Sequence, residues 1–268
     1  MAKEAGDIAE AVKGIVEAVP IYQDAIQPGA KQIGMALETV GKAVNVALAP
    51  VKGLVWGYER VGEFVTKRVA EKLQKVPPER IQTPNLMIAG PTLEALRFAG
   101  SDESLRELYA NLLATSLDSE TARNAHPSFV TIIRDMSPDE AKVMRLFATR
   151  LNFPIVDVRR IDPSRAVNQF DLAIRNFSLI GREAACTYPE LILSYQDNLC
   201  RLGLLEIPSG EFLTEPGIYE PLENDADLQG LREESLSLGH TIRFQRKLIR
   251  RTTFGGQFCQ ACVIDRAP

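Results

Sequence analysis

The sequence has few of the residues that carry enzyme chemistry, and it lacks the common nucleotide and metal motifs. Its 268 residues include two histidines, four cysteines and one tryptophan. It contains no GxGxxG, GxxxxGK[ST] or HExxH pattern and no EF-hand loop. We therefore expect a protein that works without a cofactor and without catalysis.

Long apolar runs are also absent. No segment reaches the ~20 apolar residues that a membrane-spanning helix needs. Residues 1–20 contain Glu4, Asp7, Glu10 and Glu17, whereas a secretory leader has a basic start and an uninterrupted apolar run. We therefore expect a cytoplasmic protein whose cysteines are reduced thiols. A peripheral position at the inner membrane stays open.

The charge is unevenly distributed. The net charge of −4 argues against a surface that grips nucleic acid throughout. Residues 31–76, however, carry eight basic and four acidic side chains on helices with continuous apolar stripes. Such helices can lie on an anionic membrane, or they can form a bundle within the chain or with a second copy, which is the commoner use of such stripes. The candidate membrane contacts are Lys42, Lys52, Trp56, Lys67 and Arg68.

The clearest helical pattern lies in residues 101–147. Leu105, Leu108, Leu112 and Leu113 recur at the spacing that lines one helix face, and Ser101 or Asp102 is placed to cap this helix. Two further helix starts are predicted where a proline opens a helical pattern, at Pro127 and Pro138.

The pattern changes after this segment. Residues 151–158 can form a strand or a loop, and residues 240–249 are predicted to be a strand. Short helices are predicted at residues 171–179, 188–202 and 254–262. This order is typical of a winged-helix domain, so the C-terminal unit is predicted to be winged-helix-like. The expected fold is mainly α, with an N-terminal amphipathic helical region (residues 1–76), a central helical unit (77–136) and a winged-helix-like α+β domain (137–268).

Two segments, LRELYANLLATSLD (residues 105–118) and AHPSFVTIIRDMSPDEAKVM (125–144), resemble the bacterial abortive-infection alpha (Abi-alpha) family. The resemblance runs from about residue 76 to residue 147, and the family also ends in a segment of the winged-helix type. It implies a phage-defence protein that stops an infected cell before the phage matures. It implies no catalytic residues.

Three groups of side chains are candidate sites. His126 could act as an acid or base with Asp118, Asp135 or Glu140, or it could cap the helix that follows it. A zinc site could use the four cysteines, but a single CxxC within a predicted helix favours buried thiols. The dense basic run could contact phosphates or a partner, or it could be a solvated edge strand. The cysteines are Cys186, Cys200, Cys259 and Cys262, and the basic run is Arg243, Arg246, Lys247, Arg250 and Arg251.

The charges of the C-terminal half argue against reading of a DNA sequence. The expected recognition helix, residues 188–202, has two acids and one arginine, and residues 203–239 carry nine acids against one arginine. We expect partner sensing, by a protein or phage trigger, and membrane or self-association of the N-terminal helices. A winged-helix nucleic-acid-binding regulator and a hydrolase using His126 are the alternatives.

Overall fold

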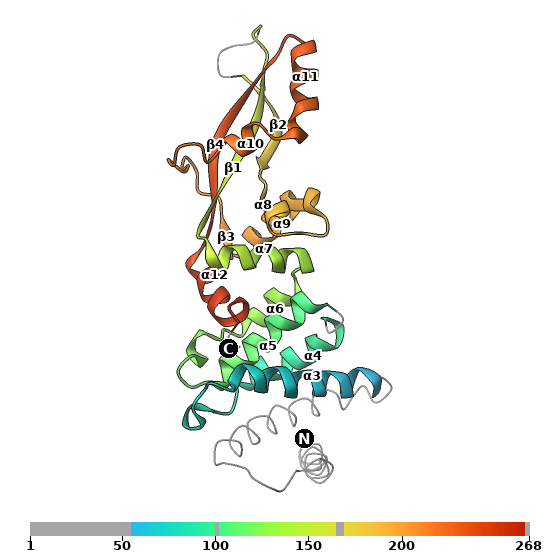
Figure 1. Cartoon of the computed structure of the whole chain (residues 1–268), viewed down its shortest axis with the longest axis vertical. Helices are drawn as coiled ribbons and strands as arrows, with labels where there is room; N and C mark the ends of the chain where they lie inside the picture. The colour runs from blue at the N-terminus through green and yellow to red at the C-terminus, as the bar shows by residue number, and fades with distance from the viewer. Residues whose placement is uncertain (1–54, 100–101, 165–168, 266–268) are drawn as a thin grey trace, which may run out of the picture. The chain divides into compact units, whose positions relative to one another are not determined.

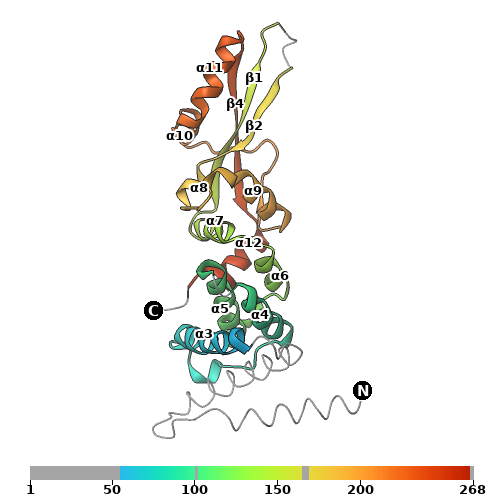
Figure 2. The ribbon, with the colours of Figure 1, turned by 90° about the vertical axis from the view of Figure 1, so that its right-hand side faces the viewer.

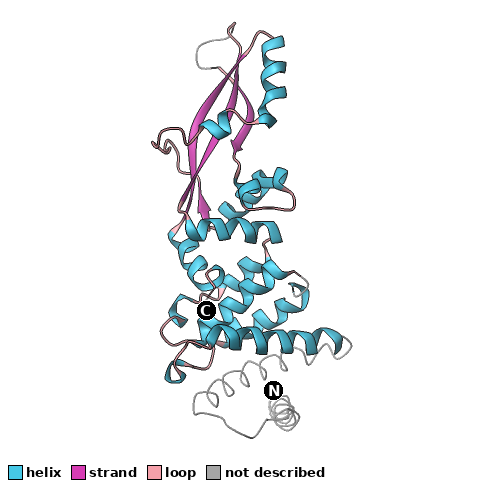
Figure 3. Cartoon of the chain, viewed as in Figure 1, coloured by secondary structure: helices cyan, strands magenta, loops and turns pink. Residues whose placement is uncertain are grey.

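The computed structural model describes residues 55–99, 102–164 and 169–265 (Figure 1). These residues form two compact units. Unit 1 contains the chain up to Pro138 together with the segment that begins at Gln260, and unit 2 is Asp139–Cys259. The named strands, magenta in Figure 3, all lie within the residue range of unit 2.

Unit 1 is helical. The elements of its main segment are α3 (Val55–Leu73), the 3₁₀ turn η2 (Pro78–Arg80), α4 (Leu86–Ala99), α5 (Glu103–Leu117), the 3₁₀ turn η3 (Ala122–Asn124) and α6 (Ser128–Arg134). Helix α5 is central, since every residue from 108 to 117 is buried. The Asp102 carboxylate accepts a hydrogen bond from the Leu105 N–H at 3.0 Å, which confirms the predicted cap.

The apolar stripe of α3 packs inside unit 1. Val61, Val65, Val69 and Leu73 are all buried, and α3 packs against α4 and α5. Burying each of these side chains is worth roughly 1.5–3 kcal/mol. The packing of this stripe is that of a helical bundle, so the buried face of α3 is not available to a membrane in this arrangement. None of the helices in the described ranges is both long and apolar enough to cross a bilayer.

Unit 1 also holds the segment after Cys259. A π-helix spans Cys259–Val263, and α5 binds its backbone through two buried polar side chains. The Asn111 amide donates to the Cys262 carbonyl and the Thr115 hydroxyl donates to the Ala261 carbonyl, each at 2.9 Å. The polar residues on the buried face of α5 therefore fasten a segment about 150 residues away in the sequence.

Unit 2 is built on an antiparallel sheet. Its strands are β1 (Asn152–Ile161), β2 (Asp171–Phe177), β3 (Leu205–Glu206) and β4 (Thr241–Arg251), in the order β2-β1-β4-β3. Strands β1 and β4 pair without interruption from Asn152 opposite Arg250 to Ile161 opposite Thr241. The register between β1 and β2 is irregular at two places. Bulges of this kind protect an edge strand from pairing with other chains.

The other elements of this part of the chain are short helices. They are α7 (Pro138–Thr149), α8 (Ile180–Glu183), η4 (Pro189–Leu191), α9 (Ile192–Arg201), α10 (Glu220–Glu223), η5 (Ala226–Leu228), α11 (Gln229–Ser237) and α12 (Thr253–Phe258). The segment of α10 and η5 covers one face of the sheet, where Val156 and Val158 pack against Tyr219, Leu222 and Leu228 (Figure 2).

The expected fold class is wrong, because the molecule is a mixed α+β protein with a four-stranded antiparallel sheet. Residues 171–177 form strand β2 rather than a helix, since they pair with β1. The helix ending at Arg201 leads into a strand of two residues and then into turns and short helices, not into a hairpin wing. Strand β4 pairs along its length with β1, which precedes that helix in the sequence. The C-terminal unit is therefore not winged-helix-like.

Candidate functional site

Strand β4 carries the basic run that the sequence singled out, and four of its five cations are bonded within unit 2. The Arg246 guanidinium donates to Glu223 at 2.7 Å and lies over the Tyr219 ring. Arg250 binds two carboxylates, Glu206 at 2.6 Å and Glu211 at 2.8 Å. These acids raise the pKa of both guanidinium groups.

Lys247 and Arg251 bind deeper groups. The Lys247 ammonium donates to the Asp157 carboxylate at 3.0 Å and to the Asn176 side-chain oxygen at 2.5 Å. Asn176 has a φ of 53° and donates its own N–H to Asp157 at 2.9 Å. Arg251 donates to the Phe147 carbonyl at 2.6 Å. Arg243 is exposed, and no ion pair joins it to another described residue.

The acidic segment of residues 203–239 supplies many of the opposing charges. Three glutamates of this segment bind the β4 arginines. In addition, Glu234 binds Arg160 at 3.1 Å, and Asp225 binds Arg182 at 2.7 Å. Burial raises the pKa of Asp225, but the hydrogen bonds from Arg182 and from the Asp227 N–H, together with the charge of Arg182, outweigh burial and hold that pKa below its usual range. Arg246 and Arg250 of the basic strand are thus paired with acids of this segment, which reduces the positive charge available to a phosphate backbone.

Asp139, at the start of α7, is a buried carboxylate with four hydrogen-bond donors around it. It accepts from the Lys142 ammonium and the Thr187 N–H at 2.8 Å, from the Tyr188 N–H at 2.9 Å and from the Tyr195 hydroxyl at 3.1 Å. Burial raises its pKa, but these donors outweigh burial and hold it well below the usual range. Asp139 therefore stays ionised and ties α7 to residues 187–195.

The four cysteines are free thiols that are partly or fully buried. Cys186 and Cys200 are half-buried, and Cys259 and Cys262 are buried. Burial raises the pKa of Cys186, Cys200 and Cys259 to about 11. Within the described ranges, no three His, Cys, Asp or Glu side chains lie where they could hold a metal ion together.

His126 lies before α6 and is exposed. Its Nδ1 accepts a hydrogen bond from the Ser128 N–H at 3.1 Å, and its ring lies 5.7 Å from that of Phe129. Asp118 binds Arg80 at 2.6 Å, and Asp135 lies 3.8 Å from Arg134. Glu140 belongs to unit 2, where it accepts from Asn198 at 2.8 Å. His126 thus contacts the backbone of Ser128, the first residue of α6, and its role as an acid, a base or a cap stays a prediction.

The five candidate membrane contacts differ in where they lie. Lys42 and Lys52 lie outside the described residues, and Trp56 belongs to a part of α3 whose side chains are not described. Lys67 is exposed on α3. Arg68 is bonded within unit 1, to Glu107 and Glu71, each at 2.8 Å.

Sequence reasoning missed the ion network beside Arg68. The Lys72 side chain is completely buried, and its ammonium lies 2.9 Å from Glu107 and 2.8 Å from Asp265. Burial raises the pKa of Glu107, but the bonds from Arg68 and Lys72 bring it below its usual value. The sequence could not indicate that Lys72 is buried, because most lysines in amphipathic helices are exposed.

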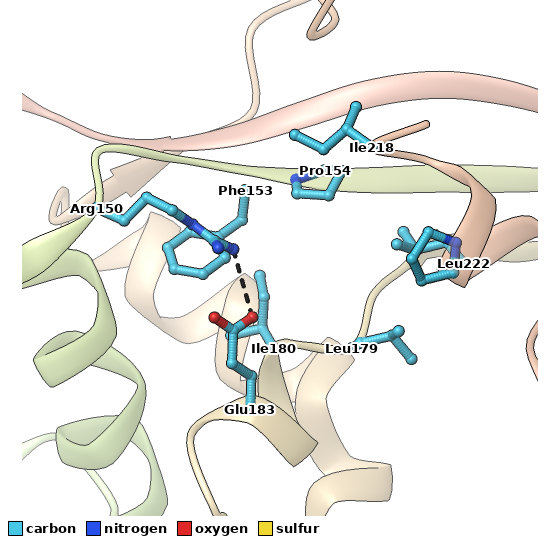
Figure 4. A pocket seen from close by; sticks show the side chains of 9 residues that line it. Arg150, Phe153, Pro154, Leu179, Ile180, Glu183, Ile218 and Leu222 are labelled. Carbon is cyan, nitrogen blue, oxygen red and sulfur yellow. Dashed lines mark hydrogen bonds and ion pairs between the residues drawn. The ribbon is translucent and has the colours of Figure 1, made fainter. Parts of the chain in front are cut away.

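Unit 2 contains a pocket of about 190 Å³ between the start of β1, helix α8 and the start of α10 (Figure 4). The Arg150 guanidinium stacks 3.6 Å from the centre of the Phe153 ring and forms an ion pair with Glu183 at 3.3 Å. The remaining lining is apolar and comprises Pro154, Leu179, Ile180, Ile218, Pro221 and Leu222.

The chain thus consists of a helical unit and a unit built on a sheet, and it is an α+β protein of two units. The chain matches the family described as Abortive infection alpha over residues 57–262 and belongs to that family, as the sequence resemblance indicated. The match spans both units.

One solved structure is similar to part of the chain. It is an uncharacterized protein from the hydrocarbon-degrading marine bacterium Alcanivorax borkumensis SK2, 18% identical, with a TM-score of 0.34. The similarity covers 52% of this chain and 92% of that one. No curated protein matches the chain.

Proposed function

We propose that this protein defends a bacterium against phage by abortive infection, and that it acts by binding a protein partner rather than by catalysis. The match to the Abortive infection alpha family over residues 57–262 carries the proposal, because it includes both units. Support for binding rather than catalysis comes from the buried and half-buried charged side chains that could have served as catalytic groups, because they bind structural groups instead. Asp139, Asp157 and Lys247 each bind groups that hold unit 2 together.

The partner surface that we propose lies on η4 and the start of α9. Tyr188, Leu191 and Leu193 are 57%, 47% and 36% exposed, and they lie close together in the sequence. Clustered exposed apolar side chains are typical of protein interaction sites. The Arg243–Arg251 run, which was the other candidate, is largely bonded to carboxylates of unit 2.

Plaque counts on a host that expresses the full chain test the proposal. The chain should reduce plaques of at least one phage in a broad panel. The double change Tyr188→Ser and Leu191→Ser should abolish this protection, whereas Leu236→Ser with Leu238→Ser, which alters two exposed residues at the end of α11, should not. Equal plaque numbers with and without the chain on every phage would refute the defence function, and equal protection by both variants would refute the proposed surface.

The effector step is assigned in this proposal to residues upstream of α3. Residues 31–54 carry three lysines, one glutamate and an apolar stripe that begins at Ile33 and ends at Leu48. Basic amphipathic segments bind anionic membranes. The face of α3 from Val61 to Leu73 is buried against α4 and α5, which supports placing the effector residues upstream of this buried face.

Liposome flotation of the full chain tests this step. The chain should float with vesicles that contain anionic lipid, and Lys42→Glu with Lys52→Glu should prevent flotation. Lys67→Glu, on the exposed side of α3, is the matched control and should have little effect. If the chain never floats but forms concentration-dependent oligomers in sedimentation, the upstream residues associate with a second copy instead.

A further inference from the structure

The pocket of unit 2 has a polar end and an apolar end. Figure 4 shows Arg150 and Glu183 facing each other at one end, with Leu222 at the other and with Ile180 and Ile218 on opposite sides between them. Phe153, Ile180 and Leu222 are almost completely buried, so the apolar part is part of the core. A ligand here must carry its charge at one end only.

The two sides of the pocket are held in place by bonds outside it. Arg182 of α8 donates to Asp225 at 2.7 Å, which joins α8 to the segment after α10. Arg150 is fixed by stacking on the Phe153 ring, and that ring also packs on Phe147 at 4.6 Å. The pocket is therefore formed by elements that are bonded to each other rather than by a loop.

The ion pair at the polar end is loose. Its N–O distance is 3.3 Å, compared with about 2.7–2.9 Å for a tight charge-assisted hydrogen bond. The two side chains are 50% and 44% exposed, and Glu183 is the one carboxylate bonded to Arg150 among the described residues. An incoming ligand can separate such a pair at small cost.

The two opposite charges decide the ligand class. A simple carboxylate that bound Arg150 would face the Glu183 carboxylate, and a simple amine that bound Glu183 would face the Arg150 guanidinium; like charges placed together oppose binding. A ligand with both a carboxylate and an ammonium satisfies both side chains and leaves no charge unpaired. The volume of about 190 Å³ lies below the roughly 300–1,000 Å³ typical of sites for larger ligands, so the ligand is small.

We propose that this pocket binds a free apolar α-amino acid of the size of leucine, methionine or phenylalanine. Arg150 binds the α-carboxylate, Glu183 binds the α-ammonium group, and the apolar side chain occupies the space between Ile180 and Ile218 toward Leu222. This assignment rests on the pocket alone and is independent of the proposed defence function.

Calorimetric titration of the full chain with five small compounds tests the ligand class. L-Leucine and L-phenylalanine carry both charges and a side chain, and glycine lacks the side chain. N-acetyl-L-leucine lacks the ammonium group, and L-leucinamide lacks the carboxylate. We expect leucine or phenylalanine to bind at least about tenfold more tightly than each of the other three. The two derivatives lose a hydrogen bond to a charged group, and glycine loses the burial of an apolar side chain; either loss typically accounts for a factor of this size. Absence of binding by leucine and phenylalanine, or equal binding of N-acetyl-L-leucine, would overturn the proposal.

Variants test the location. Arg150→Gln and Glu183→Gln should each weaken leucine binding about tenfold or more, whereas Arg175→Gln, which removes another exposed ion pair of unit 2, should not. Ile218→Phe keeps both charges and fills the pocket, so it should abolish binding while thermal unfolding stays close to that of the unchanged chain. Unchanged binding in Ile218→Phe would place the amino acid elsewhere and overturn the assignment.

Discussion

Unit 1 and unit 2 both bury charged side chains, but the signs and the partners differ. In unit 1 the buried cation Lys72 is surrounded by ions, with Glu107 and Asp265 within 3 Å. In unit 2 the buried anion Asp139 is held mainly by neutral donors, namely two backbone N–H groups and the Tyr195 hydroxyl.

This difference shows two ways to join distant parts of a chain. The ions around Lys72 connect α3, α5 and the segment at Asp265, and their partners are partly exposed, so salt can screen them. The donors to Asp139 connect α7 to residues 187–195 through short hydrogen bonds in a buried place. The contribution of the Lys72 ions should therefore depend more on ionic strength than that of the hydrogen bonds to Asp139.

The largest expected effect comes from removing the Asp139 carboxylate. Asp139→Ala leaves four donors without their acceptor and should lower the free energy of unfolding of unit 2 by about 3–5 kcal/mol. Hydrogen exchange at the Thr187 and Tyr188 amides, with urea unfolding, measures the loss. Lys142→Ala is the matched control and should cost less than about 1 kcal/mol, because that lysine is partly exposed. Equal costs for the two variants would show that the buried hydrogen bonds are not decisive.

Removing a partner of Lys72 should have the next largest effect. Glu107→Gln leaves the buried ammonium with Asp265 alone and should cost about 3 kcal/mol. Lys72→Met removes the buried charge itself and should be close to neutral, within about 1 kcal/mol. Hydrogen exchange at the backbone amides of α5 during urea unfolding reports on unit 1. A greater loss in Lys72→Met than in Glu107→Gln would contradict the buried-charge explanation.

Acid should act on both units through these carboxylates. Asp139 and Glu107 have folded-state pKa values below their ordinary ones, so their contributions are complete at neutral pH. The contributions are lost as the pH falls below about 4.3 for Glu107 and about 3.9 for Asp139, toward the lower folded-state values. Asp139→Asn should reduce the pH dependence of unit 2 between pH 5 and pH 2 in urea titrations. An unchanged pH profile in this variant would assign the acid response to other carboxylates.

The smallest effect is expected on the exposed side of β4. Arg246→Gln removes the bond to Glu223, but the arginine side chain is 52% exposed, so the loss should stay below about 1 kcal/mol. That loss should shrink further in 1 M salt, because the Debye length falls to about 3 Å. Urea unfolding at low and high salt measures it. A loss comparable to that of Asp139→Ala would mean that surface pairs, rather than buried donors, hold unit 2 together.

Much of unit 1 could be predicted from the sequence. The leucine spacing and the Asp102 cap correspond to α5, and the prolines before α6 and at the start of α7 lie where helix starts were expected. These signals are local, because capping and helix periodicity depend on residues a few positions apart.

Strand β2 could not be predicted in the same way. Ile174 and Phe177 are three residues apart, which fits one face of a short helix, whereas Leu172 and Ile174 are two apart, which fits a strand. Pairing with β1 decides in favour of the strand, and its two register shifts remove the strict alternation that would have indicated it. The mistaken winged-helix prediction followed from this segment and from the short β3.

The sequence by itself determined which residues are charged, where the helices of unit 1 begin, and the segments that resemble the Abortive infection alpha family. Only the tertiary structure decided which charges meet. Arg246 and Glu223 are 23 residues apart, and Lys72 and Asp265 are 193 apart, so no local pattern could pair them. The reason is physical: the energy of a charge depends on its distance to other charges and on its burial, and both are properties of the folded chain.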